Sequence, residues 1–460
     1  MTRQYAPVSP PVALTIAGSD SGGGAGIQAD LKTMEAHDAF GTSVVTATTA
    51  QNTTGVQDVH VLPTDHIESQ YRAVVDDFAV EAVKTGMLAT APVIETVVDC
   101  VADYPGPMVV DPVMVAATGD RLLSEDAEDA YNDLIARSTL VTPNVDEAEI
   151  LTGMEIDDAA DAERAARQLV DNGADAALVK GGHLDGEAVV DTLVIGTGDD
   201  SRTERFSHPR IDTDATHGSG CTLSSAIAAR LAGGESLTEA VAGGVAFMER
   251  AVRYGIDVGT GPGLVHHLVD IRERADRVAV TEAVESVVDR LVDRNVETLV
   301  PDVGMGVVGA TRYAETPAEV VGVDGRLTRT RNGVRPPAGV RSGGSRGLAR
   351  QLLSARETCP ELRFAVNCRF DQSVETALSA VDGPVVETVV TDANEERIDR
   401  VDHTAPVVGI DTERVANHEP PAAVVDRGDK GREPGVVLLA AEAETLIERT
   451  LTLYEALLTE

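Results

Sequence analysis

The chain of 460 residues contains a glycine-rich segment with the composition of a phosphate-binding loop, Thr216-His217-Gly218-Ser219-Gly220-Cys221. It precedes a predicted helix over 222–231, so Gly218, Ser219 and Gly220 present successive backbone N–H groups at a helix N-terminus. Such groups form an anion hole for the charge of a transferring phosphoryl group. Because the helix dipole lowers the pKa of a thiol at the helix start, we expect Cys221 to be a thiolate that accepts a hydroxyl proton. A buried structural cysteine is the alternative interpretation.

A second glycine-rich segment, residues 18–26, lies between a predicted strand over 12–17 and a predicted helix over 26–37. Its spacing matches neither the P-loop nor the dinucleotide-binding fingerprint, which excludes those two nucleotide sites. Glycine allows a ligand to approach the backbone closely and permits positive φ. The segment is therefore either a binding loop or a tight strand-to-helix turn.

Charged residues at other strand ends have the types that a phosphotransferase needs. Lys180 follows an apolar run and is one of only four lysines, so a phosphate contact is favoured over a random surface position. Asp111 and Glu147, with Asn144, supply oxygen ligands suited to Mg²⁺ and its waters. For Glu147 the alternative is an acid stabilised by the first turn of a helix. Asp30 is either a ligand contact or an acid on a helix face.

Alternating short apolar runs and amphipathic segments must position these residues. Strands are predicted over 12–17, 43–50, 82–84, 108–111, 140–142 and 176–180, and helices over 26–37, 65–76, 91–102, 126–135 and 159–171. This alternation predicts an α/β fold with a mainly parallel sheet covered by helices on both faces. Ligands bind at the carboxyl ends of such strands, where most of the candidate residues lie.

Composition narrows the possible partners. Asp and Glu number 76 against 38 Lys and Arg, a formal charge of −38, which argues against non-specific binding to nucleic acid or anionic lipid. No signal peptide or apolar run of membrane-spanning length is present, so we expect a soluble cytoplasmic protein. Scarce lysine, absent Trp and 3% aromatic residues favour a halophile cytoplasm, the alternative being an ordinary acidic protein. The four cysteines lack CxxC spacing, which argues against a zinc site or disulfide framework.

Seven motifs recur in the order found in one enzyme family. They are Gly18–Asp30 ending in GIQAD, Thr49–Gly55, Lys84–Ala89, Asp111–Met114, Thr142–Asn144, Lys180–His183 and His217–Leu223. With them, residues 10–268 resemble the hydroxymethylpyrimidine/phosphomethylpyrimidine kinases (ThiD type) of thiamine biosynthesis, which have a ribokinase-like three-layer αβα fold.

This resemblance implies two ATP-dependent phosphorylations, of 4-amino-5-hydroxymethyl-2-methylpyrimidine and then of its monophosphate. It implies that Cys221 is the base, with Gly218, Ser219 and Gly220 as the anion hole. Four residues would contact the substrate: Gly18, Asp30, Gln51 and Met87. Five would contact ATP: Asp111, Asn144, Lys180, Gly182 and His217. Mg²⁺ would be held by Asp111 and Glu147, and the chain would form a homodimer. The alternative is a pyridoxal kinase with a regulatory, ligand-binding C-terminal domain.

After a helical connection predicted over 269–289, the sequence changes to glycine-rich apolar runs followed by an arginine-rich stretch over 326–350. Motifs at 301–306, 324–326, 343–350, 366–370 and 426–434 resemble the ThiN-type thiamine-phosphate synthase domain over residues 290–457, a second, smaller α/β domain. The resemblance implies condensation of the pyrimidine diphosphate with thiazole phosphate, the phosphates being held by Arg326, Asn367, Arg369 and Lys430. An arginine surface that balances acidic neighbours is the alternative. Gly347 stands where catalytic members have His, so the domain either catalyses this step or only binds thiamine phosphate.

Overall fold

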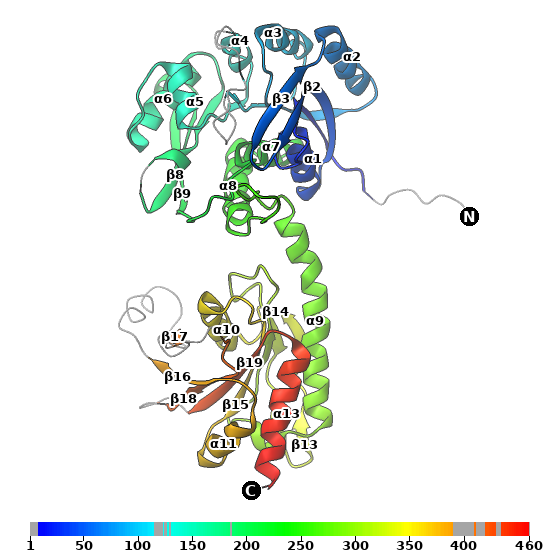
Figure 1. Ribbon diagram of the computed structural model, residues 1–460, viewed down its shortest axis with the longest axis vertical. Helices are drawn as coiled ribbons and strands as arrows, with labels where there is room; N and C mark the ends of the chain where they lie inside the picture. The colour runs from blue at the N-terminus through cyan, green and yellow to red at the C-terminus, as the bar shows by residue number, and fades with distance from the viewer. Residues whose placement is uncertain are drawn as a thin grey trace, which may run out of the picture. The chain divides into compact units, whose positions relative to one another are not determined.

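The structure is a computed structural model that describes residues 8–114, 123, 127, 130–184, 186–389, 409–410, 419–428 and 434–459 (Figure 1). The chain divides into two compact units, Met1–Asp270 and Ile271–Glu460. Each unit has its own sheet and its own buried core, and each is described separately below.

The first unit is built on a nine-stranded sheet with the order β3-β2-β1-β4-β5-β6-β7-β8-β9. The neighbouring pairs from β2 to β7 are parallel, and β3, β8 and β9 are added antiparallel at the two edges. The strands are β1 Val12–Ser19, β2 Phe40–Asn52, β3 Gly55–Val61, β4 Val80–Thr85, β5 Met108–Val110, β6 Leu140–Val141, β7 Ala176–Val179, β8 Ala188–Ile195 and β9 Arg202–Pro209.

Helices cover both faces of this sheet. They are α1 Gly26–Ala36, α2 Thr64–Val75, α3 Ala91–Cys100, α4 Tyr131–Ile135, α5 Val145–Thr152, α6 Ala159–Asp171, α7 Ser219–Ala232 and α8 Leu237–Arg253, with 3₁₀ turns at Gly181–His183 and Gly198–Asp200. Side chains of α2 to α6 pack with Leu14 and Ile16 on one face. Helices α7 and α8 pack with Val109 and Leu178 on the other face.

Alternation along the strands explains the three layers. Val109 belongs to one core and Val110 to the opposite one, because successive strand residues point to opposite faces. Central strands buried on both faces read as continuous apolar runs, which is why the parallel sheet could be predicted. The α/β fold class is confirmed. Strands β3, β8 and β9 were not predicted. The partly exposed, polar sequences of β3 and β9 lack that signal, whereas β8 is largely apolar and half buried, so its signal was present and was missed.

The second unit contains an eight-stranded sheet with the order β14-β11-β10-β15-β19-β18-β16-β17, in which only the β16–β18 pair is parallel among the described strands. A separate β12–β13 hairpin accompanies it. The strands are β10 Val307–Gly309, β11 Val321–Asp324, β12 Thr328–Thr330, β13 Gly333–Arg335, β14 Gly339–Ser342, β15 Phe364–Arg369, β16 Val385–Val389, β17 Gly409–Ile410, β18 Ala423–Asp426 and β19 Gly435–Ala440.

Helices also cover both faces of the second sheet. They are α9 Val269–Asp293, α10 Arg346–Thr358, α11 Gln372–Ala377 and α13 Ala443–Thr459, with 3₁₀ turns at Glu297–Leu299 and Leu378–Ala380. Helices α9, α11 and α13 pack on one face, and α10 packs on the other with Val308 and Ala365. Val280 and Val284 of α9 are buried in the core of this unit. The helix predicted as a connection is therefore also part of the second unit's core.

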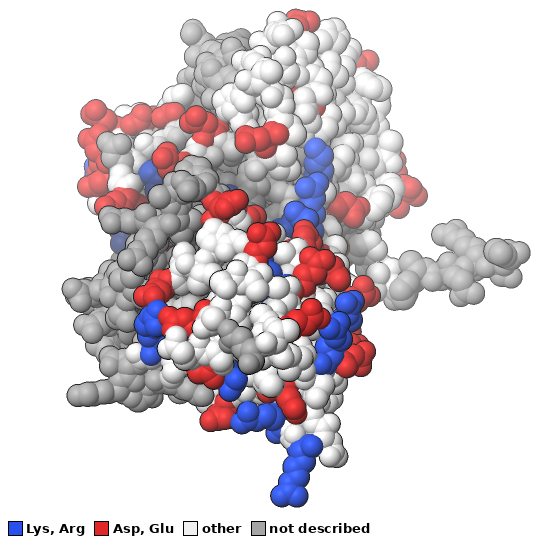
Figure 2. Space-filling view, turned by 60° about the horizontal axis from the view of Figure 1, so that its bottom comes forward, with Lys and Arg blue, Asp and Glu red and all other residues white. Residues whose placement is uncertain are grey.

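Acidic side chains dominate the surface. On the face shown in Figure 2, the described Lys and Arg side chains form small separate groups among Asp and Glu side chains, without a continuous basic stripe. Exposed ion pairs occur in the second unit, such as Arg427 with Glu387 at 2.8 Å. Among the described residues, no helix is both long enough and apolar enough to cross a membrane.

Candidate active site

The glycine-rich loop after β1 is held in shape by Asp20. The buried Asp20 carboxylate accepts hydrogen bonds from the backbone N–H groups of Gly22, Gly24 and Ala25 at 2.7, 2.9 and 2.8 Å. Burial opposes ionisation, but the contact with His217 and the three N–H donors outweigh it and lower the pKa of Asp20. A permanently charged side chain thus fixes the loop that leads into α1.

The two glycine-rich segments lie against each other, and this contact requires glycine. Gly218 has φ +83°, and a Cβ there would lie 1.9 Å from the carbonyl oxygen of Gly24. A Cβ on Gly24 would in turn lie 2.8 Å from Cδ2 of His217. The glycines therefore serve close packing of two backbones as well as access for a ligand.

Helix α7 begins at this contact, with Gly218 as its N-cap. The first-turn N–H groups of a helix have no intrahelical acceptor. Here the Ser219 N–H, predicted to be part of the anion hole, donates instead to the Thr216 carbonyl at 3.1 Å. The N–H groups of Gly220 and Cys221 are the donors that this turn offers to an anion. A Cβ on Gly220 would lie 3.3 Å from Lys180 Nζ and 3.5 Å from Asp111 Oδ2. The predicted anion hole and the predicted phosphate-binding lysine are thus brought to one place.

Lys180 lies between two carboxylates. Its Nζ is 3.2 Å from Asp111 Oδ1 and 4.0 Å from Glu147 Oε2. Burial disfavours the charged form, but Asp111 and Glu147 outweigh it and raise the pKa of Lys180. Thr142 Oγ1 and Ser224 Oγ, each 3.4 Å from an Asp111 oxygen, complete the surroundings of that carboxylate.

Glu147 has two structural roles at once. It forms a capping box at the start of α5, in which Glu147 N–H donates to Asn144 Oδ1 and Asn144 N–H donates to Glu147 Oε2, at 2.8 and 2.9 Å. Burial raises the pKa of Glu147 to about 7, against the opposing effect of Lys180. Glu147 is therefore an acid in the first turn of a helix, as the alternative interpretation predicted, and its carboxyl group also faces Lys180.

Asp111 and Glu147 offer hard oxygen ligands, but the described residues contain no group of three or more His, Cys, Asp or Glu side chains that could hold a metal by themselves. Mg²⁺ is often bound by one or two carboxylates together with phosphate oxygens and water. The two carboxylates beside Lys180 fit that kind of site, in which the metal arrives with a nucleotide.

Cys221 lies in the first turn of α7, but its environment differs from the prediction. Burial raises the pKa of Cys221 to about 11; the Lys84 ammonium and the Gly26 N–H oppose this rise, and the Asp30 and Asp111 carboxylates add to it. The predicted thiolate is wrong for the resting protein, because burial and two carboxylates outweigh the helix terminus. Taken as a whole residue, Cys221 is only partly buried.

Three of the predicted substrate residues, Gly18, Gln51 and Met87, lie at or near the start of the glycine-rich loop that follows β1. Gly18 N–H donates to the Met87 carbonyl at 3.1 Å, and a Cβ on Gly18 would lie 3.2 Å from Met87 Sδ. The carboxamide nitrogen of Gln51 lies 3.4 Å from His217 Nε2, which is also 3.4 Å from Asp20 Oδ2. The contacts of His217, predicted to bind ATP, are thus with Asp20 and the predicted substrate residue Gln51.

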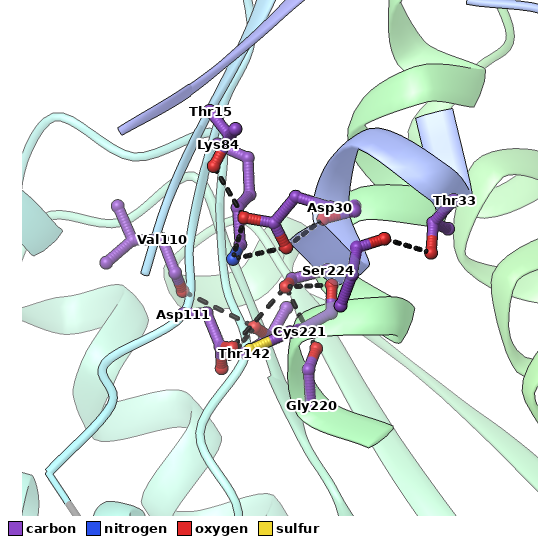
Figure 3. Close-up of polar contacts among 12 residues, drawn as sticks. Thr15, Asp30, Thr33, Lys84, Val110, Asp111, Thr142, Gly220, Cys221 and Ser224 are labelled. Carbon is purple, nitrogen blue, oxygen red and sulfur yellow. Dashed lines mark hydrogen bonds and ion pairs between the residues drawn. The ribbon is translucent and has the colours of Figure 1, made fainter. Parts of the chain in front are cut away.

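Asp30, also predicted to contact the substrate, is fully buried. Its oxygens are occupied by Lys84, Thr15 and Ser225, as Figure 3 shows for the labelled partners. A carboxylate enclosed in this way has no free surface for a ligand, which corrects the prediction. The space beside Gly182, by contrast, is open, and its carbonyl accepts a hydrogen bond from Arg210 at 2.9 Å.

In the second unit, Arg326 and Asn367 converge on the segment before β10. Asn367 Oδ1 accepts the Gly306 N–H at 2.6 Å, and Arg326 Nη1 lies 3.4 Å from the Gly304 carbonyl. Arg369 lies two residues further along β15, on the same face as Asn367, and pairs with Asp371 at 3.1 Å. Lys430 lies outside the described residues.

The start of α10 lies beside the Asn367 contact. Its N-cap, Ser345, has φ +47°, and a Cβ on Gly306 would lie 3.1 Å from both Ser345 Oγ and Asn367 Oδ1. A Cβ on Gly347 would meet nothing within 4 Å. The position that lacks the expected histidine therefore has room for a side chain.

Asp20 and Lys84 each stand at the end of a predicted strand and within a motif of the resembled family, but neither was assigned a specific role from the sequence. For Asp20, an acid flanked by glycines is the signal of a loop held by its own backbone N–H groups. For Lys84, the position at a strand end in a lysine-poor chain is the same signal that pointed to Lys180.

Comparison with known proteins matches each unit to a family. Residues 20–266 match the family model of phosphomethylpyrimidine kinase, and residues 283–452 match that of thiamine-phosphate synthase ThiN. The hydroxymethylpyrimidine/phosphomethylpyrimidine kinase of Streptomyces coelicolor is 49% identical over 268 residues, covering 58% of this chain and 98% of that protein. The thiamine biosynthesis bifunctional protein ThiED of Geobacter sulfurreducens is 46% identical over 57% of this chain and 54% of that protein.

Among solved structures, the pyridoxal kinase from Staphylococcus aureus in complex with AMP-PCP and pyridoxal has a TM-score of 0.53 and 33% identity. The match covers 58% of this chain and 96% of that chain, so the fold of the first unit is that of the vitamin kinases. The matches over the first and second units lead to one conclusion: the chain belongs to the phosphomethylpyrimidine kinase family and carries a ThiN domain as its second unit.

Proposed function

We propose that the first unit transfers the γ-phosphoryl group of ATP to the hydroxymethyl group of 4-amino-5-hydroxymethyl-2-methylpyrimidine and then to the resulting monophosphate. One observation carries the proposal: the first turn of α7, Lys180 and Cys221 meet at the carboxyl ends of the central strands. A hydroxyl and a phosphoryl group placed there would face a proton acceptor and an anion hole together.

In this mechanism Gln51 orients the pyrimidine ring, because its carboxamide offers both a donor and an acceptor. Met87 packs against the ring, and Gly18 allows the ring to approach the backbone. The substrate hydroxyl then gives its proton to the ionised Sγ of Cys221 while its oxygen bonds to the γ-phosphorus. The bond from that phosphorus to the bridging oxygen breaks, and ADP leaves.

The charge of the transferring group is met by the chain itself. The N–H groups of the first α7 turn are fixed before the reaction, so they need no reorganisation as negative charge grows on the phosphoryl oxygens. Lys180 adds a compact positive charge, and Asp111 holds it in position at 3.2 Å. Asp111 and Glu147 would hold Mg²⁺ with the nucleotide, which supplies neutralisation of phosphate charge when bound.

Pyridoxal phosphorylation is the competing candidate, since structural neighbours of this fold act on pyridoxal. The higher identity of 49% to a hydroxymethylpyrimidine/phosphomethylpyrimidine kinase, against 33% to the pyridoxal kinase, favours the pyrimidine. Initial rates with each alcohol at saturating ATP and Mg²⁺ decide between them. We expect a higher kcat/KM for the pyrimidine, and turnover of pyridoxal alone would overturn the proposal.

For the second unit we propose a site for a phosphorylated thiamine intermediate or product, formed by Arg326, Asn367 and the start of α10. Bidentate guanidinium groups and a helix N-terminus both suit phosphate oxygens. The resemblance implies an imidazole at position 347, which this chain lacks, so we propose binding without efficient condensation. Calorimetric titration with thiamine phosphate, compared with the same titration of the Arg326→Ala variant, tests the site. Equal affinity of the two proteins would contradict it.

A further inference from the structure

Behind the first turn of α7, the fully buried side chains of Lys84 and Asp30 form an ion pair (Figure 3). Lys84 Nζ lies 2.9 and 3.0 Å from the two Asp30 oxygens. Asp30 also accepts the hydroxyl of Thr15 at 2.6 Å and that of Ser225 at 2.7 Å. The proposed reaction does not use either charge directly.

The cluster joins four elements of the first unit. Thr15 comes from β1, Asp30 from α1, Lys84 from β4 and Ser225 from α7. Ser225 lies one helical turn after Cys221, so its bond to Asp30 ties the beginning of α7 to the sheet. The fit is close, because a Cβ on Gly86 would lie 2.8 Å from Lys84 Nζ.

A gain in folding stability does not by itself explain the buried Lys84–Asp30 ion pair. Taking two charges out of water costs several kcal/mol per ion, and well-packed apolar residues of similar volume are often equally or more stabilising. Cys221 lies one helical turn before Ser225, whose hydroxyl donates to Asp30 at 2.7 Å, so it is the reactive side chain that α7 brings next to the pair. Lys84 favours the Cys221 thiolate, and Asp30 opposes it.

We propose that Lys84 and Asp30 are positioning residues that set the charge balance at Cys221, Lys84 supporting the thiolate that takes the substrate proton and Asp30 fixing the ammonium and α7. This inference rests on the proposed function. The charged groups facing Cys221 are Lys84 from β4, Asp30 from α1, Asp111 after β5 and Lys180 after β7, together with the Gly26 N–H. Of the two cations, only Lys84 is outside the region proposed for phosphate.

The test uses the full chain without nucleotide or divalent cation and measures the rate of Cys221 alkylation by iodoacetamide at pH 8, with the labelled peptide resolved by mass spectrometry. The thiolate is the reacting form, so the rate reports its population. Lys84→Met should slow alkylation about tenfold or more, and Asp30→Asn should accelerate it by a similar factor, since an opposite or like charge nearby shifts a pKa by about one unit or more.

Ser225→Ala is the matched control, because it removes a hydrogen bond to the same carboxylate without changing any charge. Its alkylation rate should stay within about twofold of the unmodified chain. The double variant Lys84→Met/Asp30→Asn leaves no buried charge unpaired, so it keeps the test possible if a single variant does not fold. Its rate should lie between those of the single variants.

Changes in the same direction in Lys84→Met and Asp30→Asn, or rates of all variants within twofold, would overturn the inference. Kinase kinetics give an independent readout: kcat of Lys84→Met should fall, the KM for ATP should change less than about threefold, and raising the pH should restore part of kcat. A chain that alkylates as expected but phosphorylates neither alcohol would refute the proposed function and leave the charge balance standing.

Discussion

Gly220→Ala separates catalysis from folding at the centre of the site. Gly220 is in the first turn of α7 with ordinary helical backbone, so alanine requires no strained φ. Helix propensity favours alanine over glycine by up to about 1 kcal/mol. We therefore expect a chain that is folded and at least as stable as the unmodified protein.

The new methyl group would nevertheless occupy the space that the transferring phosphoryl group needs. Its carbon would lie 3.3 Å from Lys180 Nζ and 3.5 Å from Asp111 Oδ2. Alanine keeps the backbone N–H of residue 220, but a methyl group that holds the phosphoryl group away from the helix start weakens its hydrogen bonds there. We take the loss of one anion-hole donor, about 10²- to 10³-fold in kcat or about 2.7 to 4 kcal/mol, as the size of this effect. We expect a loss of that size, with a smaller effect on the KM for the pyrimidine.

Gly233→Ala, at the opposite end of the same helix, is the control. Its backbone is also right-handed, and its Cβ would lie 3.3 Å from the Arg230 carbonyl oxygen, far along α7 from Lys180. The assay couples ADP release to NADH oxidation, with thermal unfolding of each variant measured in parallel. Full activity in Gly220→Ala, or an equal loss in Gly233→Ala, would refute the anion-hole assignment.

Four further outcomes are expected. Cys221→Ala should lose most turnover, while ATP binding measured by calorimetry persists. Because the pKa of Cys221 is raised to about 11, kcat of the unmodified chain should rise from pH 7 to pH 9 as more of the thiol ionises. A kcat that does not change with pH would contradict the role of Cys221 as base. The pKa of Glu147 is raised from 4.5 to about 7 in the folded protein, so between these pH values the folded state binds more protons than the unfolded state. The free energy of unfolding should therefore fall as the pH rises from 4.5 to about 7. The unfolding temperature of Glu147→Gln should fall less over the same pH range. Gly347→His has room for its side chain, and increased thiamine phosphate formation by chromatography would identify the missing imidazole as the deficit. With a net charge of −38, the unfolding midpoint should rise from 0.1 M to 2 M KCl, and equal midpoints would argue against a high-salt origin.

The chemistry of the first unit could be predicted where residue type alone carries it. Glycines before α7, Lys180 after an apolar strand and Asp111 at a strand end are local features, and a parallel sheet brings such ends together. The geometry bears this out for Gly220, Lys180 and Asp111, which lie within a few ångströms of one another.

What could not be predicted depends on burial and on contacts between distant segments. A helix start lowers a thiol pKa in isolation, but the environment of Cys221 includes Asp30 and Asp111, which are 191 and 110 positions away in the sequence. Asp30 was predicted to contact the substrate because it ends a glycine-rich motif. Its actual partner, Lys84, comes from strand β4, 54 positions away in the sequence, whereas Asp30 itself lies on helix α1. Edge strand β9 was missed because its exposure removes the apolar signal.

The central claim is most directly tested by incubating the full chain with 4-amino-5-hydroxymethyl-2-methylpyrimidine, ATP, Mg²⁺ and thiazole phosphate in high KCl, and following all products by liquid chromatography and mass spectrometry. We predict the pyrimidine monophosphate first, then the diphosphate, with two ADP formed per diphosphate and little or no thiamine phosphate. Absence of any phosphorylated pyrimidine, with ATP left intact, would contradict the claim.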